Sequence, residues 1–168
     1  MFNYCPTCNS ENIKFIQEYC FNCADCDFIY YHNVASAVAA IIVFEDKILF
    51  TTRAQSPGLG LLDLPGGFVD PNETLEQALS REINEELGID ITSWQYFCSQ
   101  PNIYRSNNIE YRTLDSVFLS KQKNSLSFTL QETEISKICW ISPEQIDLEK
   151  IAFPSTKAAL NIYLERLL

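Results

Sequence analysis

The chain has 168 residues, of which 22 are acidic, 12 are basic and 46% are apolar, and its net charge is −10. This length allows one ordinary domain and a small accessory unit, and the apolar content suffices for a buried core, which excludes a disordered chain. The acidic balance disfavours nucleic-acid binding, because that binding depends on clustered lysines and arginines. We therefore expect a small ligand rather than a nucleic acid.

The sequence carries no sign of a membrane protein. Its first residues lack a basic stretch followed by an apolar run. The longest apolar run, Ala37–Phe44, is far shorter than the roughly 20 residues that span a bilayer. We therefore expect a cytoplasmic protein without a membrane partner.

Five of the seven cysteines lie at the start of the chain, in the segments CPTC and CFNCADC. Two pairs of thiolates, each pair separated by two residues, can hold one tetrahedral zinc ion with a structural role. Cys5 and Cys8 form one pair, and the spacing leaves open whether Cys20 and Cys23 or Cys23 and Cys26 form the other. An odd number of cysteines without a secretion signal disfavours disulfides. We predict a zinc ribbon over residues 1–33, whose folding depends on the metal because the unit is so small.

The rest of the chain mixes strands and helices without strict alternation, which predicts an α+β domain with a mixed sheet over residues 34–168. Strands are expected at 37–44 and 47–52, joined as a hairpin, then a loop at 56–67 and a helix at 74–87 that ends at Gly88. Either Asp70 or Thr74 would cap this helix. Further strands are expected at 94–104, 111–120 and 138–141, with a polar turn at 106–108. A last helix would follow Pro154, with Ser155 as its cap.

The helix at 74–87 carries an unusual cluster of carboxylates. Glu82, Glu85 and Glu86 lie within about one turn, beside the apolar stripe and near the negative end of the helix dipole. A solvated acidic face would place lysines four residues away, and this helix has none. Hard oxygen ligands at this density suit Mg²⁺ or Mn²⁺. Arg81 could hold a glutamate in a bidentate pair, and the backbone at Gly66 and Gly67 can approach a ligand closely.

These residues belong to a signature that resembles a known family. The segment GFVDPNETLEQALSREINEELGI, which starts at Gly67, matches the Nudix box without departure. The resemblance implies an α/β/α sandwich with a mixed sheet, and the metal-dependent hydrolysis of a nucleoside diphosphate linked to another group. It also implies roles for individual residues: Glu82, Glu85 and Glu86 as metal-binding and water-activating carboxylates, the Gly66 carbonyl as a further ligand, and Arg81 with Glu73 as a supporting pair. Which glutamate is the general base stays open.

Residues outside the box resemble the NADH pyrophosphatase subfamily. Cys26 is followed by DFIYY, as in that subfamily, which implies that Cys5, Cys8, Cys23 and Cys26 bind the zinc. Ser99, Gln100 and Pro101 match the start of the subfamily's SQPWPFPxS motif, whereas the WPFP part does not match, so the choice of dinucleotide stays open. The resemblance also implies a homodimer and a further metal ligand at Glu134.

Three hypotheses follow. The favoured one is a pyrophosphohydrolase of NAD(H), ADP-ribose or a related dinucleotide, in which Arg53 contacts phosphate, Gln100 contributes to substrate binding, and Tyr104 or Tyr111 stacks on a base. The second is a hydrolase of RNA 5′ ends that uses the ribbon to bind RNA; the single base of residues 1–33, Lys14, disfavours it. The third is a non-catalytic regulator that senses nucleotides, and the complete glutamate set argues against it.

Overall fold

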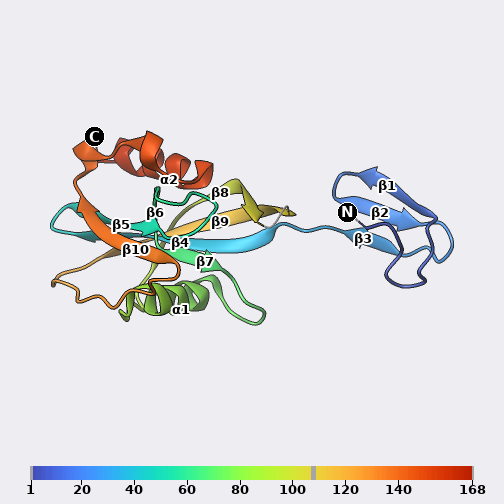
Figure 1. Cartoon of the computed structure of the whole chain (residues 1–168), viewed down its shortest axis with the longest axis horizontal. Helices are drawn as coiled ribbons and strands as arrows, with labels where there is room; N and C mark the ends of the chain where they lie inside the picture. Colours follow the sequence, from blue (N-terminus) through green and yellow to red (C-terminus); the bar gives the residue numbers. More distant parts are fainter. Residues whose placement is uncertain (1, 107–108, 168) are drawn as a thin grey trace. The chain divides into compact units, whose positions relative to one another are not determined.

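The computed structural model describes residues 2–106 and 109–167 and divides the chain into two compact units. The first, which we call the ribbon unit, ends at Val34, and the second, the larger unit, begins at Ala35. Figure 1 labels the elements of both. No helix in the described ranges is long and apolar enough to cross a membrane.

The ribbon unit is a three-stranded antiparallel sheet built around one phenylalanine. Its strands, in spatial order, are β1 (Ile13–Gln17), β2 (Cys20–Cys23) and β3 (Ile29–Tyr31). The Phe21 ring is buried, and four other aromatic rings, those of Phe2, Phe15, Phe28 and Tyr30, lie 5.4–6.5 Å from it. So small an apolar core buries little surface, which leaves much of the stability of this unit to its cysteine site.

The larger unit contains a mixed sheet of seven strands. These are β4 (Ala35–Phe44), β5 (Lys47–Arg53), β6 (Leu62–Asp63), β7 (Gly66–Phe68), β8 (Gln95–Ser106), β9 (Ile109–Lys121) and β10 (Ile135–Ile141). The main path runs β10-β5-β4-β9-β8, while β6 pairs with β5 and β7 pairs with β4. Only the β4–β9 pair is parallel among these pairings. The predicted mixed sheet is therefore confirmed.

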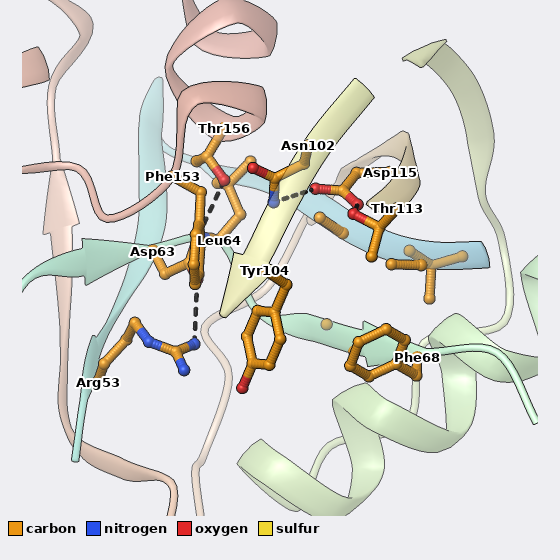
Figure 2. Close-up of a pocket in the computed structure, with 15 residues that line it drawn as sticks. Arg53, Asp63, Leu64, Phe68, Asn102, Tyr104, Thr113, Asp115, Phe153 and Thr156 are labelled. Atoms are coloured by element: carbon orange, nitrogen blue, oxygen red, sulfur yellow. Dashed lines mark hydrogen bonds and ion pairs between the residues drawn. The ribbon is translucent and has the colours of Figure 1, made fainter. Parts of the chain in front are cut away.

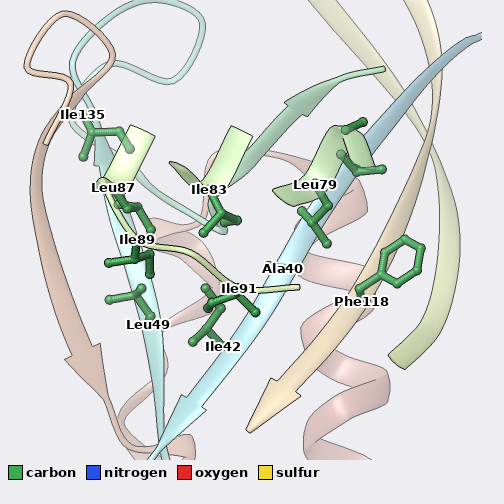
Figure 3. Close-up of a cluster of buried hydrophobic side chains, with 12 residues drawn as sticks. Ala40, Ile42, Leu49, Leu79, Ile83, Leu87, Ile89, Ile91, Phe118 and Ile135 are labelled. Carbon is green, nitrogen blue, oxygen red and sulfur yellow. The ribbon is translucent and has the colours of Figure 1, made fainter. Parts of the chain in front are cut away.

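The sheet carries one helix on each face, which confirms the α/β/α sandwich (Figure 1). Helix α1 (Leu75–Leu87) packs against one face and α2 (Pro154–Glu165) against the other. Strand β4 serves both cores, because Ala40 and Ile42 belong to the cluster under α1 and Ile41 to the cluster under α2. Figure 3 shows the side chains beneath α1. Two short 3₁₀ turns, η1 (Pro143–Gln145) and η2 (Leu148–Lys150), precede α2.

Helix α1 begins and ends where its sequence predicts. Thr74 caps it, since its hydroxyl accepts from the Gln77 amide while the Gln77 side chain accepts from the Thr74 amide. Gly88 ends it in the left-handed conformation, with φ at 67°. Of the two predicted starts, Thr74 is therefore the cap.

Two local predictions fail. The segment 56–67 contains β6 and the start of β7 rather than loop alone, because pairing with β5 and β4 creates strands that no local pattern indicates. Ser155 does not cap α2: Phe153 occupies the cap position and the Ser155 hydroxyl donates to Asp115. The predicted turn at 106–108 includes residues outside the described ranges.

We predict that Leu79→Ala lowers the free energy of unfolding of the larger unit by about 2–5 kcal/mol, because Leu79 is fully buried between α1 and the sheet. Urea unfolding followed by tryptophan fluorescence tests this selectively, since both tryptophans, Trp94 and Trp140, lie in the larger unit. Glu76→Ala, at an exposed position of the same helix, is the control and should change the value by less than about 0.5 kcal/mol.

Candidate functional site

Arg81 organises the acidic side chains of α1. Its guanidinium forms a bidentate pair with Glu73, at 2.8 and 2.9 Å, and lies 2.8 Å from Glu82 Oε1 and 3.2 Å from Glu85 Oε2. It also donates to the Phe68 carbonyl oxygen at 3.0 Å. The bonds from Arg81 lower the pKa of Glu73, and the surrounding carboxylates raise the pKa of Arg81. Arg81 thus fixes three glutamates and ties the helix to β7.

Glu86 lies deeper than the other glutamates. Its side chain is buried, and Oε2 accepts from the Gly66 amide at 3.0 Å. Burial raises its pKa well above the ordinary value, and the nearby carboxylates of Glu82, Asp63 and Glu134 add to the rise. The Glu82 pKa is also raised, mainly by burial. Ionisation of these two glutamates in the folded chain is therefore unfavourable unless a cation lies beside them.

Gly66 and Gly67 allow this close approach between α1 and the sheet. A Cβ at Gly66 would overlap the Val38 carbonyl oxygen of β4, and the residue has φ at 145°. A Cβ at Gly67 would lie 2.5 Å from the carboxylate carbon of Glu82. The two glycines therefore make room for the sheet backbone and for a glutamate of the helix.

Three carboxylates line a small polar cavity, whereas Glu82 and Glu85 are not among its lining residues. Its walls include acidic side chains from three elements or their ends: Asp63 from β6, Glu86 from α1 and Glu134, which directly precedes β10. The Gly66 backbone and Arg53 also line it. The structure thus brings Glu134 next to the helix glutamates, 48 residues away from Glu86 in the sequence.

Oxygen donors of this kind fit a hard divalent cation. Mg²⁺ is commonly held by one or two carboxylates together with waters and phosphate oxygens, so it does not require a closed cage of protein ligands. The glutamates do not form a closed cage: within the described ranges, only the four cysteines discussed below place three or more ligand atoms of histidine, cysteine, aspartate or glutamate within 4.8 Å of one another. Arg81 holds the carboxylates of Glu82 and Glu85, and Gly66 holds that of Glu86.

A second cavity adjoins the first and is partly aromatic (Figure 2). The rings of Phe68, Tyr104 and Phe153 line it, with Tyr104 at 5.5 Å from Phe68 and 5.8 Å from Phe153 between ring centroids. Arg53 lies against Phe153, 4.9 Å from its ring centroid, and lines both cavities. The Arg53 guanidinium therefore lies between the polar cavity and the aromatic cavity. This position suits a ligand that has phosphates and a planar ring.

Of the residues predicted to bind the substrate, some line the aromatic cavity and others do not. Arg53 and Tyr104 line the aromatic cavity, whereas Gln100 is not among its lining residues. Asn102, two residues further along β8 on the same face, occupies the wall instead. Tyr111 contacts the Phe68 ring at 6.2 Å and lies next to the cavity rather than in its wall.

Sequence reasoning missed Asp63. This buried aspartate pairs with Arg53 at 3.3 Å and accepts bonds from the Leu64 amide and the Thr156 hydroxyl. Burial raises its pKa to about 6, although the Arg53 charge opposes the shift. Its segment, LLDLPGG, shows only a lone acid among apolar residues. Its side-chain partners Arg53 and Thr156 come from β5 and α2, so no local pattern could have indicated its role.

The ribbon unit contains a compact cluster of four thiols. The sulfur atoms of Cys5, Cys8, Cys23 and Cys26 all lie within 4.8 Å of one another. Cys20 is buried outside this cluster. Four converging sulfurs are the ligand set of a structural zinc ion, and this is the set that the subfamily resemblance implies.

Comparison with known proteins gives a consistent result. The chain matches the family described as "NUDIX domain" over residues 34–160. A relative named NAD-capped RNA hydrolase NudC, from Vibrio atlanticus, is 33% identical over 104 residues, which cover 62% of this chain and 38% of the relative. The protein of the same name from Haemophilus influenzae is 30% identical over 144 residues, covering 84% of this chain and 52% of that protein. The chain therefore spans about half or less of the length of these relatives.

A solved structure extends the similarity to the fold. The crystal structure of a Nudix hydrolase from Nitrosomonas europaea superposes with a TM-score of 0.68 at 26% identity. The superposition covers 97% of this chain and 90% of that one.

We predict that Glu86→Gln raises the free energy of unfolding by about 1–3 kcal/mol at pH 8 without added divalent ions, because it removes a buried charge. Since folding raises the pKa of Glu86, wild-type stability should fall as the pH rises from about 4.5 through the folded-state pKa. Tryptophan-monitored urea unfolding at several pH values measures both effects. The gain should disappear near pH 4, where the carboxyl is protonated in both states.

The control is Glu76→Gln, at an exposed position in the first turn of α1. It should leave the pH dependence of stability unchanged. A wild-type chain and a Glu86→Gln variant with parallel stability profiles would contradict the account of Glu86 as a buried and uncompensated charge.

Proposed function

Because the chain belongs to the Nudix family, we propose that it hydrolyses the pyrophosphate bond of an NAD-type dinucleotide or of ADP-ribose, with divalent metal at the carboxylates of α1. The observation that carries this proposal is the pair of glutamates on α1, Glu82 half-buried on Arg81 and Glu86 buried on the Gly66 amide, beside a cavity that combines Arg53 with aromatic rings. A diphosphate with bound metal ions meets the first feature and a nucleoside meets the second.

The metal ligands that we propose are oxygen atoms in and next to the polar cavity. The Gly66 carbonyl, Glu86 and Glu134 line the cavity, and Glu82 and Glu85 lie on the same helix as Glu86. Mg²⁺ or Mn²⁺ bound there would neutralise the diphosphate and lower the pKa of a water molecule. Glu82 and Glu86, whose pKa values are raised, would hold these ions, and one of the glutamates would take the proton from the attacking water.

The other residues orient the reactants. Arg81 and Glu73 form the ion pair that fixes the carboxylates of Glu82 and Glu85, so they act through those residues. Arg53, held by Asp63, would bind a phosphate oxygen of the substrate. Tyr104 would stack on a substrate ring in the aromatic cavity.

A second candidate substrate is RNA with an NAD-type 5′ cap. The names of the NudC relatives favour it, since the reactive bond and its dinucleotide are the same. The ribbon unit adds little support, because Lys14 is the single lysine or arginine of residues 1–33. In this case the dinucleotide end would occupy the same cavities and the RNA would make few further contacts.

We predict that the chain cleaves NADH, NAD⁺ or ADP-ribose in the presence of Mg²⁺ or Mn²⁺, and that Glu82→Gln and Glu86→Gln each lower kcat by roughly 100-fold or more. Chromatography of the mononucleotide products identifies the broken bond, and an NAD-capped RNA in the same panel tests the second candidate. Glu76→Gln is the control and should keep wild-type activity. Full activity of both glutamine variants on every substrate would contradict the assignment of the metal site.

We also propose that the ribbon unit holds one structural zinc ion through Cys5, Cys8, Cys23 and Cys26. The expected metal content is one zinc per chain. Cys23→Ser should lose this zinc, whereas Cys20→Ser, which changes a buried thiol outside the cluster, should retain it. Elemental analysis of the purified variants decides the matter, and loss of zinc in Cys20→Ser with retention in Cys23→Ser would reverse the ligand assignment.

A further inference from the structure

One wall of the aromatic cavity carries an aspartate that the proposed chemistry does not use. Asp115 lies on β9 and lines the cavity together with Asn102 and Thr113. Its carboxylate accepts three hydrogen bonds, from Asn102 Nδ2 at 3.0 Å, Thr113 Oγ1 at 2.6 Å and Ser155 Oγ at 2.6 Å. All three donors are uncharged, so they hold the carboxylate in place and do not neutralise its charge.

The distribution of these bonds leaves one acceptor position. Two donors, Asn102 and Ser155, reach Oδ2, and one, Thr113, reaches Oδ1. A carboxylate offers about four acceptor positions, so one on Oδ1 is still available. Because Asp115 is partly exposed and lines the cavity, a bound ligand can supply the fourth donor.

The rings opposite define the shape of that ligand. Phe68, Tyr104 and Phe153 line the same cavity and present flat apolar surfaces. Figure 2 shows the Asp115 carboxylate and these three rings in one close-up. A planar ring would contact the aromatic side chains through its faces and the carboxylate through a substituent at its edge.

On the basis of the proposed function, we infer that Asp115 is a specificity-determining residue, which selects a planar ring with an N–H donor at its edge and rejects a ring with a carboxylate. A fixed anion repels a second anion, whereas a donor completes its hydrogen bonds. In NAD-type substrates two rings carry such a donor, namely adenine with its amino group and nicotinamide with its carboxamide. The chemistry that the two rings share is the N–H donor.

Asp115 also contacts α2 through Ser155, so a test must distinguish a structural role of Asp115 from a role in specificity. Its bond to Ser155 reaches the first turn of α2, a turn that has no acidic residue and no side-chain cap of its own. An acid at a helix N-terminus stabilises the helix. A residue that only anchors α2 would affect all ligands equally, whereas a specificity residue changes the ratio between matched ligands.

The experiment measures dissociation constants of two matched ligand pairs by NMR titration of the full chain. Nicotinamide mononucleotide and nicotinic acid mononucleotide differ in a carboxamide against a carboxylate. AMP and purine riboside 5′-monophosphate differ in an amino group against a hydrogen atom, so the second ligand has no N–H donor on its ring. We expect the N–H donor of one pair to favour binding by about tenfold in the wild-type chain. The pair that shows this preference identifies the ring in the cavity. Equal binding within both pairs would overturn the inference.

Variants then assign the preference to the carboxylate. Asp115→Asn should reduce the tenfold ratio to about twofold, because its amide can donate to a carboxylate or accept from an amine. Ser155→Ala removes the contact with α2 and keeps the carboxylate, so it should retain the ratio. Glu110→Gln, which changes an exposed carboxylate of β9 that pairs with Arg105, is the matched control. An unchanged ratio in Asp115→Asn, or a ratio lost equally in Ser155→Ala, would overturn the inference.

Two features of this design keep its outcome separate from other failures. A ratio compares two ligands on the same sample, so partial unfolding of a variant cancels. The readout is binding, so a chain that hydrolyses no dinucleotide would contradict the proposed function, while the ligand ratios would still decide the role of Asp115.

Discussion

The arrangement of this site depends on the guanidinium of Arg81. Between Asp70 and Asp90 it is the single basic side chain among seven acids, and it donates hydrogen bonds to three of them. Without it, the carboxylates of Glu82 and Glu85, which lie on one turn of the helix, would repel each other. Its charge is shared among its bonded partners, whereas Glu86 accepts from the Gly66 amide and its burial makes ionisation unfavourable. The protein thus places a carboxylate that is unfavourable to ionise at the site where we propose that a metal ion binds.

Features that depend on neighbouring residues could be predicted from the sequence. The span of α1 follows from apolar residues at helical spacing and from the Thr74 and Gly88 caps, because each signal acts within one or two turns. The β4–β5 hairpin likewise follows from two apolar runs around a turn. The carboxylate cluster was recognisable because all of its helix members lie on one element, where a fixed periodicity places them together.

Features that depend on residues far apart in the chain could not be predicted from the sequence. Ser155 resembles a cap in the sequence, but its hydroxyl is taken by Asp115, which is 40 residues away. The aromatic cavity combines side chains from β7, β8 and the start of α2, and none of these segments shows a periodicity that points to the others. Asp63 is a lone acid whose role becomes visible only when Arg53 and Thr156 meet it. The two glycines before α1 predict close approach of the backbone to a ligand. The structure shows a further reason for them that no local pattern gives, because they make room for Glu82 and for the β4 backbone.

The parallel pairing of β4 with β9 also constrains how the chain folds during synthesis. The register extends from Ala35 opposite Thr113 to Val43 opposite Lys121. Strand β4 therefore cannot pair with β9 until the ribosome has synthesised residues up to about 121. Contacts of such long sequence separation form slowly. The strands of the ribbon unit, in contrast, pair only with one another, and all of them lie before residue 34. We therefore expect the chain to fold in two stages, in which the ribbon unit folds before β4 pairs with β9.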